Sequence, residues 1–431
     1  MFEYVASGLN HSRINKNSLK HAFKADPNSP VINIINELIS SIQKDNHKVS
    51  FLFNAYTEKS LGDVFTSIIR PDTIYNRYAD SGGLQMVTLG HVSNEAMKEK
   101  VYKIQADYGT VGMCFDEIPV TTIGKGSVTD MSNRRFDPTM VDAKAKETGA
   151  NLKRQIEVFN GIPNNKCKPM LIIQGNCYDS YNKWLDISLK EVGHNNWKYI
   201  KGISSASSSF GSGVLEYFQQ LFYMTHLDLP NDFTVDHFHL LGVGSLSRLL
   251  PLMPLLKNGK IKDSTTISYD STTHTSGISL GSYYMNKRLM DFTKYKDLDF
   301  YNIFDDINKN LAELGFNSID EEHLFHRLSQ PNLWDDKMGV NVHVYEEFFT
   351  IFAYLVSSIH NFISDVDCLR YDNAYYEDFA ISKGLLLPLN SFQDCRDFKD
   401  FSEWENVYRK VLKSKKVISL GDAPPNLNDF F

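Results

Sequence analysis

Two aspartates, each at the end of an apolar run, could together catalyse a glycosyl transfer. Asp80 closes one strand-length run and stands before the glycine pair Gly82 and Gly83, and Asp270 closes a later run. One carboxylate can attack the anomeric carbon of a sugar and form a covalent intermediate, while a second carboxylic acid protonates the leaving group. The alternative is that each aspartate only caps the helix or turn that follows it.

Two further apolar runs end in a third acid, Asp116, and an amide, Gln174, which could bind a nucleobase through hydrogen bonds. Asp116, directly after Phe115, can accept hydrogen bonds from N1 and the exocyclic amine of a guanine, a pair of donors that adenine does not present. Gln174 can donate an amide hydrogen bond to a base carbonyl. The alternatives are a helix N-cap for Asp116 and a plain strand-to-helix turn for Gln174.

Glycine-containing turns follow two more runs. Backbone N–H groups from Gly202 onwards can face a ligand, and Leu241 with Gly242 can form a flat apolar wall beside a ring. The segment 241–244 is not a dinucleotide-binding fingerprint, because the third glycine of that motif is missing. A plain turn is the alternative for each of these segments.

The elements that would position these residues alternate along the chain. Strands are expected at 50–55, 74–79, 110–115, 169–173, 199–203, 237–241 and 267–269, and helices at 94–104, 141–159, 181–191, 213–223 and 246–256. The alternation indicates parallel βαβ units, and their number favours an α/β fold with a TIM-type (β/α)8 barrel over a doubly wound open sheet. In a barrel all strand ends share one rim, which holds the active site.

The pattern of the chain changes near residue 290. Residues 1–290 are expected to form the catalytic barrel. Residues 291–431 contain amphipathic, charged and aromatic segments, which predict a mostly helical C-terminal region. We expect this region to close the barrel, to carry its eighth unit near the start, and to contact nucleic acid or a partner protein.

Composition limits the class of protein. Of the 431 residues, 42% are hydrophobic, which is enough for a large core, and the net charge of −7 argues against a whole-surface attraction to nucleic acid while allowing a local basic face such as Arg134 and Arg135. Five cysteines without a CxxC pair argue against a cysteine-rich zinc site and fit a reducing, cytoplasmic compartment. The N-terminal segment lacks a signal pattern and no apolar run has the length of a membrane span, so no membrane contact is expected.

The motifs occur in an order that resembles a known family. DSGGLQ (80–85), FDE (115–117), IIQG (172–175), KGIS (201–204), LLGVG (240–244) and an aspartate after a strand are similar to the motifs of the tRNA-guanine transglycosylases, which read DSGGFQ, FDE, QG, GGLAVGE, LMGVG and FDCVxPTR. The resemblance covers roughly residues 75–275.

The resemblance implies a role for each matching residue. Asp80 would be the general acid–base, Asp270 the nucleophile and Asp116 the carboxylate that recognises guanine. Gln174 and the backbone of Gly202 would bind the purine carbonyl. Further base contacts are implied for Ser81, Gly82, Gly83, Leu84, Leu241 and Gly242, with Leu84 and Leu241 as the two walls of the pocket. Arg248 and His274 would contact nucleic acid.

The chain also departs from that family. Leu84 replaces an aromatic residue, the segment 271–274 replaces the arginine-containing PTR, and no cysteine lies between Cys177 and Cys368, where the family has its CxCxxC…H zinc motif. No structural zinc and no other cofactor is therefore expected. These departures leave the catalytic acids and alter the polymer-recognition parts, as in the DNA-guanine transglycosylases of the DpdA group, which the chain resembles most.

The expected function is therefore that of a glycosyltransferase. The chain would exchange guanine in DNA for a 7-deazaguanine base, such as 7-cyano-7-deazaguanine, through a covalent aspartyl-glycosyl intermediate. Three alternatives remain: a tRNA-guanine transglycosylase that lacks zinc, a non-catalytic partner subunit of one, and an unrelated TIM-barrel hydrolase that uses the same two acids.

Overall fold

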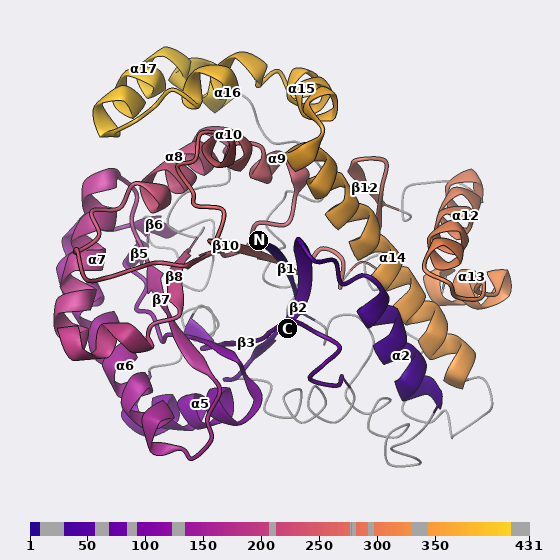
Figure 1. The fold of residues 1–431 in the computed structure, drawn as a ribbon, viewed down its shortest axis with the longest axis horizontal. Helices are drawn as coiled ribbons and strands as arrows, with labels where there is room; N and C mark the ends of the chain where they lie inside the picture. The colour runs from indigo at the N-terminus through magenta and orange to yellow at the C-terminus, as the bar shows by residue number, and fades with distance from the viewer. Residues whose placement is uncertain are drawn as a thin grey trace.

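The fold is built around a closed barrel of eight parallel strands (Figure 1). The structure is a computed structural model that describes residues 1–8, 30–56, 69–83, 93–122, 134–206, 213–275, 277, 282–291, 297–329 and 344–414. In their order around the barrel the strands are β1 (Phe2–Ser7), β10 (Thr266–Ser271), β9 (His237–Leu240), β8 (Gly202–Ser205), β7 (Lys168–Ile173), β4 (Val111–Met113), β3 (Arg77–Asp80) and β2 (His47–Asn54). This architecture confirms the TIM-type barrel.

Helices on the outside of the barrel bury their apolar faces against the strands. The helices of this layer are α2 (Pro30–Ser41), α5 (Glu95–Tyr108), α6 (Val141–Gly161), α7 (Tyr178–Val192), α8 (Val214–Thr225), α9 (Leu246–Leu249) and α10 (Leu252–Lys257). In α6, for example, Ala145, Leu152, Ile156 and Phe159 are buried at helical spacing. The helix expected at 246–256 is divided into α9 and α10, with Pro251 at the N-cap of α10, because proline has no backbone N–H to continue a helix.

The eighth barrel strand lies at the N-terminus, so the expectation of an eighth unit near residue 290 is wrong. Strand β1 pairs with β2 (Phe2 with His47) on one side and with β10 (Phe2 with Ile267) on the other. All six of its residues are buried, and the Met1 ammonium donates to the Thr265 carbonyl at 3.0 Å. A short strand buried on both faces has no alternating polar pattern to reveal it.

The C-terminal region is helical, as expected, and its longest helix completes the outer layer. It comprises α12 (Asp297–Glu313), α13 (Glu321–Ser329), α14 (Val344–Tyr371), α15 (Asn373–Ser382), α16 (Leu386–Phe392) and α17 (Phe398–Ser414). Helix α14 lies beside α2 (Figure 1). Its Phe362 ring contacts Tyr4 of β1 and Tyr269 of β10, and its Asp367 contacts His47 Nδ1 at 2.9 Å. This helix therefore covers β1, β2 and β10.

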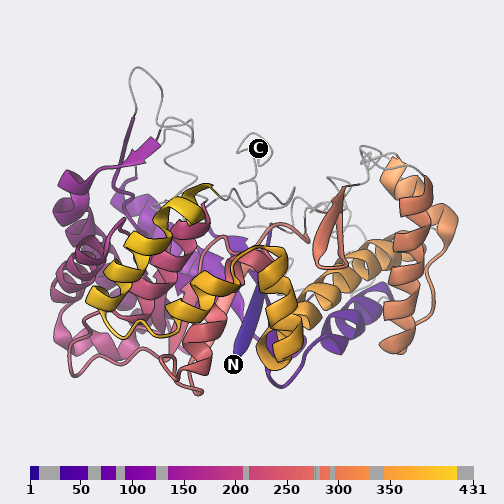
Figure 2. The ribbon, with the colours of Figure 1, turned by 90° about the horizontal axis from the view of Figure 1, so that it is seen from above.

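Two antiparallel hairpins stand at the carboxyl-end side of the barrel (Figure 2). One joins β5 (Val120–Thr122) to β6 (Arg134–Phe136), and the other joins β11 (Ser282–Met285) to β12 (Arg288–Asp291). Short 3₁₀ turns, η3 (Pro138–Met140) and η4 (His194–Tyr199), precede α6 and β8. Because the carboxyl ends of barrel strands form the active-site rim, the hairpins border the candidate site.

Gly202 packs inside the sheet instead of lining the rim. It is the first residue of β8, three residues before the strand ends at Ser205, which corresponds to about 10 Å along a strand. A Cβ at Gly202 would lie 2.1 Å from the carbonyl oxygen of His237 on β9. The expected contact between Gly202 and a purine carbonyl is therefore wrong. The error arose because the strand was expected at 199–203, whereas 194–199 form η4 and the strand runs on to Ser205.

The Gly202→Ala substitution is expected to destabilise the barrel. The methyl group would clash with a strand carbonyl, and overpacking of this kind lowers the free energy of unfolding by about 1–3 kcal/mol. Chemical denaturation measures the loss. Gly161→Ala is the matched control, because a Cβ there has nothing within 4 Å, and it should change stability by less than about 0.5 kcal/mol. Equal stabilities of the two variants would contradict the packing role of Gly202.

Candidate active site

Asp80 and Asp270 face the same side of the barrel interior at the carboxyl ends of β3 and β10. Asp270 Oδ1 accepts a hydrogen bond from the backbone N–H of Gly242 at 2.7 Å, and Asp80 Oδ2 accepts one from Asn54 Nδ2 at 3.3 Å. Gly242 has φ +70°, a left-handed conformation that glycine adopts without strain and that directs its N–H at Asp270. The two acids interact electrostatically across the rim.

The surroundings of Asp80 make it a proton donor near neutral pH. Burial, with the negative charge of Asp270 next in size, raises the pKa of Asp80 from 3.8 to about 6, although hydrogen bonds from the Ser81 and Gly82 backbone oppose the shift. Asp270 is held by a backbone donor on its Oδ1 atom. Asp80 is thus suited to hold and release a proton, whereas the Gly242 N–H fixes the orientation of the Asp270 carboxyl group.

The turn after β3 is packed against its neighbours. Ser81 is buried, and its Oγ accepts from the Gly83 N–H at 3.4 Å. Gly82 has φ +79°, and a Cβ there would lie 2.4 Å from Cβ of Tyr56. A Cβ at Gly83 would lie 2.9 Å from Asp116 Oδ1. The two glycines therefore let the turn approach both the loop after β2 and the third acid, Asp116.

Asp116 and Gln174 form a buried pair beside this turn. Gln174 Nε2 donates to Asp116 Oδ2 at 2.6 Å. Burial raises the pKa of Asp116 from 3.8 to about 7, while the hydrogen bond from Gln174 lowers it and the charge of Asp80 raises it further. Donors from a bound ligand would favour the ionised form of Asp116. The structure thus brings together Asp80, Asp116, Gln174 and Asp270, whose closeness the sequence predicted from strand ends.

The glutamate of the FDE segment anchors the Asp116 loop. Glu117 accepts from Lys98 Nζ at 3.4 Å and from Lys144 Nζ at 3.2 Å, and its backbone N–H donates to Thr148 Oγ1 at 2.9 Å. Asn151 Nδ2 donates to the Phe115 carbonyl at 2.9 Å. The lysines and Asn151 were not singled out from the sequence, because single polar residues on the helices gave no signal of their tertiary partners.

Of the other predicted residues, Leu241 and Arg248 lie beside the site. Leu241 is half-buried beside the site, and its N–H donates to the Ser205 carbonyl at 3.2 Å. Leu84 lies outside the described residues. Arg248 Nη1 donates to the Gly242 carbonyl at 2.7 Å, and its guanidinium lies 4.7 Å from the Tyr217 ring centroid. Arg248 therefore braces the turn that holds Asp270, and its contact with nucleic acid stays a prediction.

His274 cannot contact a polymer in this structure, so that expectation is wrong. Its side chain is buried, its Nδ1 lies 2.8 Å from Ser358 Oγ of α14, and its ring packs against Tyr4 and Phe362. Burial lowers the pKa of His274 to about 3, so the ring is neutral. His274 is thus part of the contact between the barrel and α14.

Two comparisons with known proteins found no relative of the chain. No protein-family model matches the chain, and no curated protein matches it. Within the described ranges, no three histidine, cysteine, aspartate or glutamate side chains are grouped so as to hold a metal ion. The helices that the structure describes include none with the length and apolar character needed to cross a bilayer.

Proposed function

We propose that this chain is a base-exchanging transglycosylase that replaces guanine in DNA by a 7-deazaguanine. The observation that carries the proposal is the grouping of two carboxyl groups, those of Asp80 and Asp270, on one rim of the barrel. Asp80 has a pKa of about 6, and Asp270 receives the Gly242 N–H. The Asp116–Gln174 pair beside them supplies hydrogen-bonding groups of the kind that bind a purine edge.

The reaction would proceed in two displacements at C1′ of the target nucleotide. The nucleotide leaves the base stack, which costs a few kcal/mol. Oδ2 of Asp270 attacks C1′, the bond from C1′ to N9 of guanine breaks, and the proton of Asp80 passes to the departing base. The incoming 7-deazaguanine gives its N9 proton to Asp80, attacks C1′ and releases the Asp270 carboxylate. Guanine and deazaguanine change places, with no net change in protons or electrons.

Features of the chain favour DNA over tRNA as the polymer. The sequence lacks the PTR arginine and the zinc-binding cysteines that serve tRNA recognition in the similar family. Arg135 is exposed on the β5–β6 hairpin at the carboxyl-end side of the barrel (Figure 2), where it can meet a phosphate. A transglycosylase acting on tRNA without zinc, and a non-catalytic partner subunit, are the competing proposals.

Incorporation of labelled guanine tests the proposed function and its polymer. The purified full-length chain is incubated with duplex DNA and, separately, with bulk tRNA. Label entering DNA alone supports the proposal, and label entering tRNA alone supports the tRNA enzyme. Label entering neither polymer argues against catalysis by the chain alone and favours a partner subunit or an unrelated hydrolase.

The Asp116→Asn substitution is expected to weaken guanine selection. The amide replaces one acceptor by a donor facing the base's own donors, so kcat/KM for guanine should fall by about 100-fold or more, mainly through KM. Competition by hypoxanthine, which lacks the exocyclic amine, measures the change in selectivity. Asp142→Asn, on an exposed helix position paired with Lys183, is the matched control and should retain guanine exchange. Unchanged guanine selectivity in Asp116→Asn would exclude this role for Asp116.

A further inference from the structure

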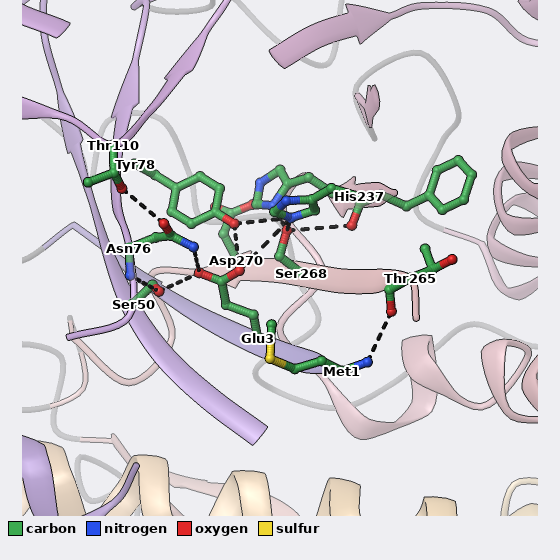
Figure 3. A network of polar contacts seen from close by, with 12 residues as sticks. Met1, Glu3, Ser50, Asn76, Tyr78, Thr110, His237, Thr265, Ser268 and Asp270 are labelled. Carbon is green, nitrogen blue, oxygen red and sulfur yellow. Dashed lines mark hydrogen bonds and ion pairs between the residues drawn. The ribbon is translucent and has the colours of Figure 1, made fainter. Parts of the chain in front are cut away.

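A network of buried polar side chains lies inside the barrel next to Asp270 (Figure 3). Glu3 comes from β1, Tyr78 from β3, His237 and His239 from β9, and Ser268 from β10, and all five side chains are buried. Burying so many polar groups in a barrel core is costly unless each finds a partner. We therefore expect these five side chains to have a role other than packing.

A consistent placement of the protons in this network follows from the hydrogen bond that Tyr78 donates to Glu3. Tyr78 Oη donates to Glu3 Oε2 at 2.9 Å, so it can only accept from His237 Nε2, 3.2 Å away. His237 Nε2 therefore carries a proton, which it also directs at Ser268 Oγ at 2.6 Å. Ser268 then uses its single proton toward His239 Nδ1 at 2.7 Å, a shorter contact than its 3.5 Å to the Phe238 carbonyl.

The proton of His239 consequently sits on Nε2, the atom nearest Asp270. His239 Nε2 lies 3.5 Å from Asp270 Oδ1, the same oxygen that accepts the Gly242 N–H. The imidazole is held in this orientation by stacking on Tyr78, with ring centroids 5.2 Å apart and planes 26° apart. A contact of 3.5 Å is long for a hydrogen bond, but such catalytic contacts often tighten when substrate binds.

We propose that His239 is a positioning residue for the nucleophile, in the Nε2–H form set by Ser268 and His237. The inference rests on the proposed function. His239 and Gly242 together hold Oδ1 of Asp270, which fixes the orientation of the carboxylate and leaves Oδ2 to attack C1′. His239 was not predicted from the sequence, because a single histidine inside an apolar strand gives no local signal of its buried partners.

The charged and titratable groups around His239 come from four strands. Tyr78 and Asp80 face it from β3, His237 from β9, Asp270 from β10 and Glu3 from β1. A positive charge on His239 would lower the pKa of Glu3 and of Asp80. The rates of the His239 variants are therefore compared at a single pH.

Two substitutions at His239 distinguish the role of its Nε2 atom from that of its Nδ1 atom. The amide nitrogen of His239→Gln reaches the Nε2 position, whereas the amide of His239→Asn reaches only the Nδ1 position, where its oxygen can accept from Ser268. We expect His239→Gln to form the covalent adduct within about threefold of the unsubstituted rate. His239→Asn should be slower by about 10- to 100-fold, because it loses a hydrogen bond to a charged group.

Equal rates of adduct formation for the two variants would overturn the proposal. Thermal unfolding of both variants excludes a loss that is only structural, and an Asn variant that is unfolded is replaced by His239→Phe, which keeps the stacking on Tyr78 but has no ring nitrogen. The same loss of rate is expected for His239→Phe, and a rate like that of His239→Gln would overturn the proposal equally.

Nitrogen-15 NMR of histidine-labelled full-length protein tests the proposal without requiring exchange. The His239 signals, assigned by their loss in His239→Gln, should show a proton on Nε2 and none on Nδ1 near neutral pH. A proton on Nδ1 alone would overturn the proposal whatever the activity. An Nε2–H form in a protein that exchanges no base would uphold the placement of His239 against Asp270 and refute only the proposed function.

Discussion

Replacing Asp270 by alanine is expected to abolish both base exchange and the covalent enzyme–DNA adduct. The substitution removes the only atom that would bond to C1′, and loss of a nucleophile typically lowers kcat by about 10⁴-fold or more. The same change removes the acceptor for the Gly242 N–H and the partner of His239. Single-turnover exchange and gel detection of the adduct measure the effect.

A second aspartate near β10 provides the control for this variant. Asp263 is exposed in the segment that precedes the strand, at the opposite end from the candidate site. Asp263→Ala should therefore retain both exchange and adduct. An Asp270→Ala protein that still exchanges guanine would refute the assignment of Asp270 as the nucleophile and would require another residue to form the intermediate.

Replacing Asp80 by asparagine is expected to slow adduct formation by about 10²- to 10⁴-fold, the usual contribution of a general acid. The unsubstituted protein should form adduct most rapidly when Asp80 is protonated, so its rate should fall as pH rises through about 6. The asparagine variant should lack this alkaline limb. Stopped single-turnover reactions between pH 5 and 8 compare the two profiles, and an unaltered limb in Asp80→Asn would assign it to another group.

The stability of Asp80→Asn should change in the opposite direction from its activity. The pKa of Asp80 is raised from 3.8 to about 6 in the folded state, so folding binds the proton more tightly. This costs no stability below pH 3.8, and the cost grows between pH 3.8 and 6 and is constant above. Asparagine removes the cost, which is up to about 3 kcal/mol above pH 6. Denaturation at pH 8 should show a more stable variant, so its lost activity would not be due to unfolding.

The barrel was predictable because its strands end in recognisable residues. Apolar runs that stop at Asp80, Asp116, Gln174 and Asp270 predicted the parallel units and the grouping of these four residues. Strand β1 was missed because its run is short and buried on both faces. That it closes the barrel depends on pairing with β2 and β10, which are distant in sequence.

The candidate site was predictable only where a residue stands at a strand's carboxyl end. The prediction for Gly202 was wrong because β8 begins at this residue, so an error of a few residues in the strand bounds placed it at the wrong end of the barrel. The prediction for His274 was wrong because its partner Ser358 lies on α14, 84 positions further along the chain. The polar network from Glu3 to His239 could not be predicted, because its members lie on four separate strands. Residues whose role depends on tertiary contacts were missed or wrongly predicted, because local sequence patterns do not encode those contacts.

Mapping the covalent intermediate tests the central claim most directly. The full-length protein is reacted with a guanine-containing DNA oligonucleotide, denatured to trap the adduct, digested, and analysed by mass spectrometry. We expect a deoxyribosyl-linked oligonucleotide that has lost one guanine, bonded to the peptide that contains Asp270, and its disappearance when free guanine is added before denaturation. An adduct on a different residue, or guanine exchange without any adduct, would contradict the assignment of Asp270 as the nucleophile.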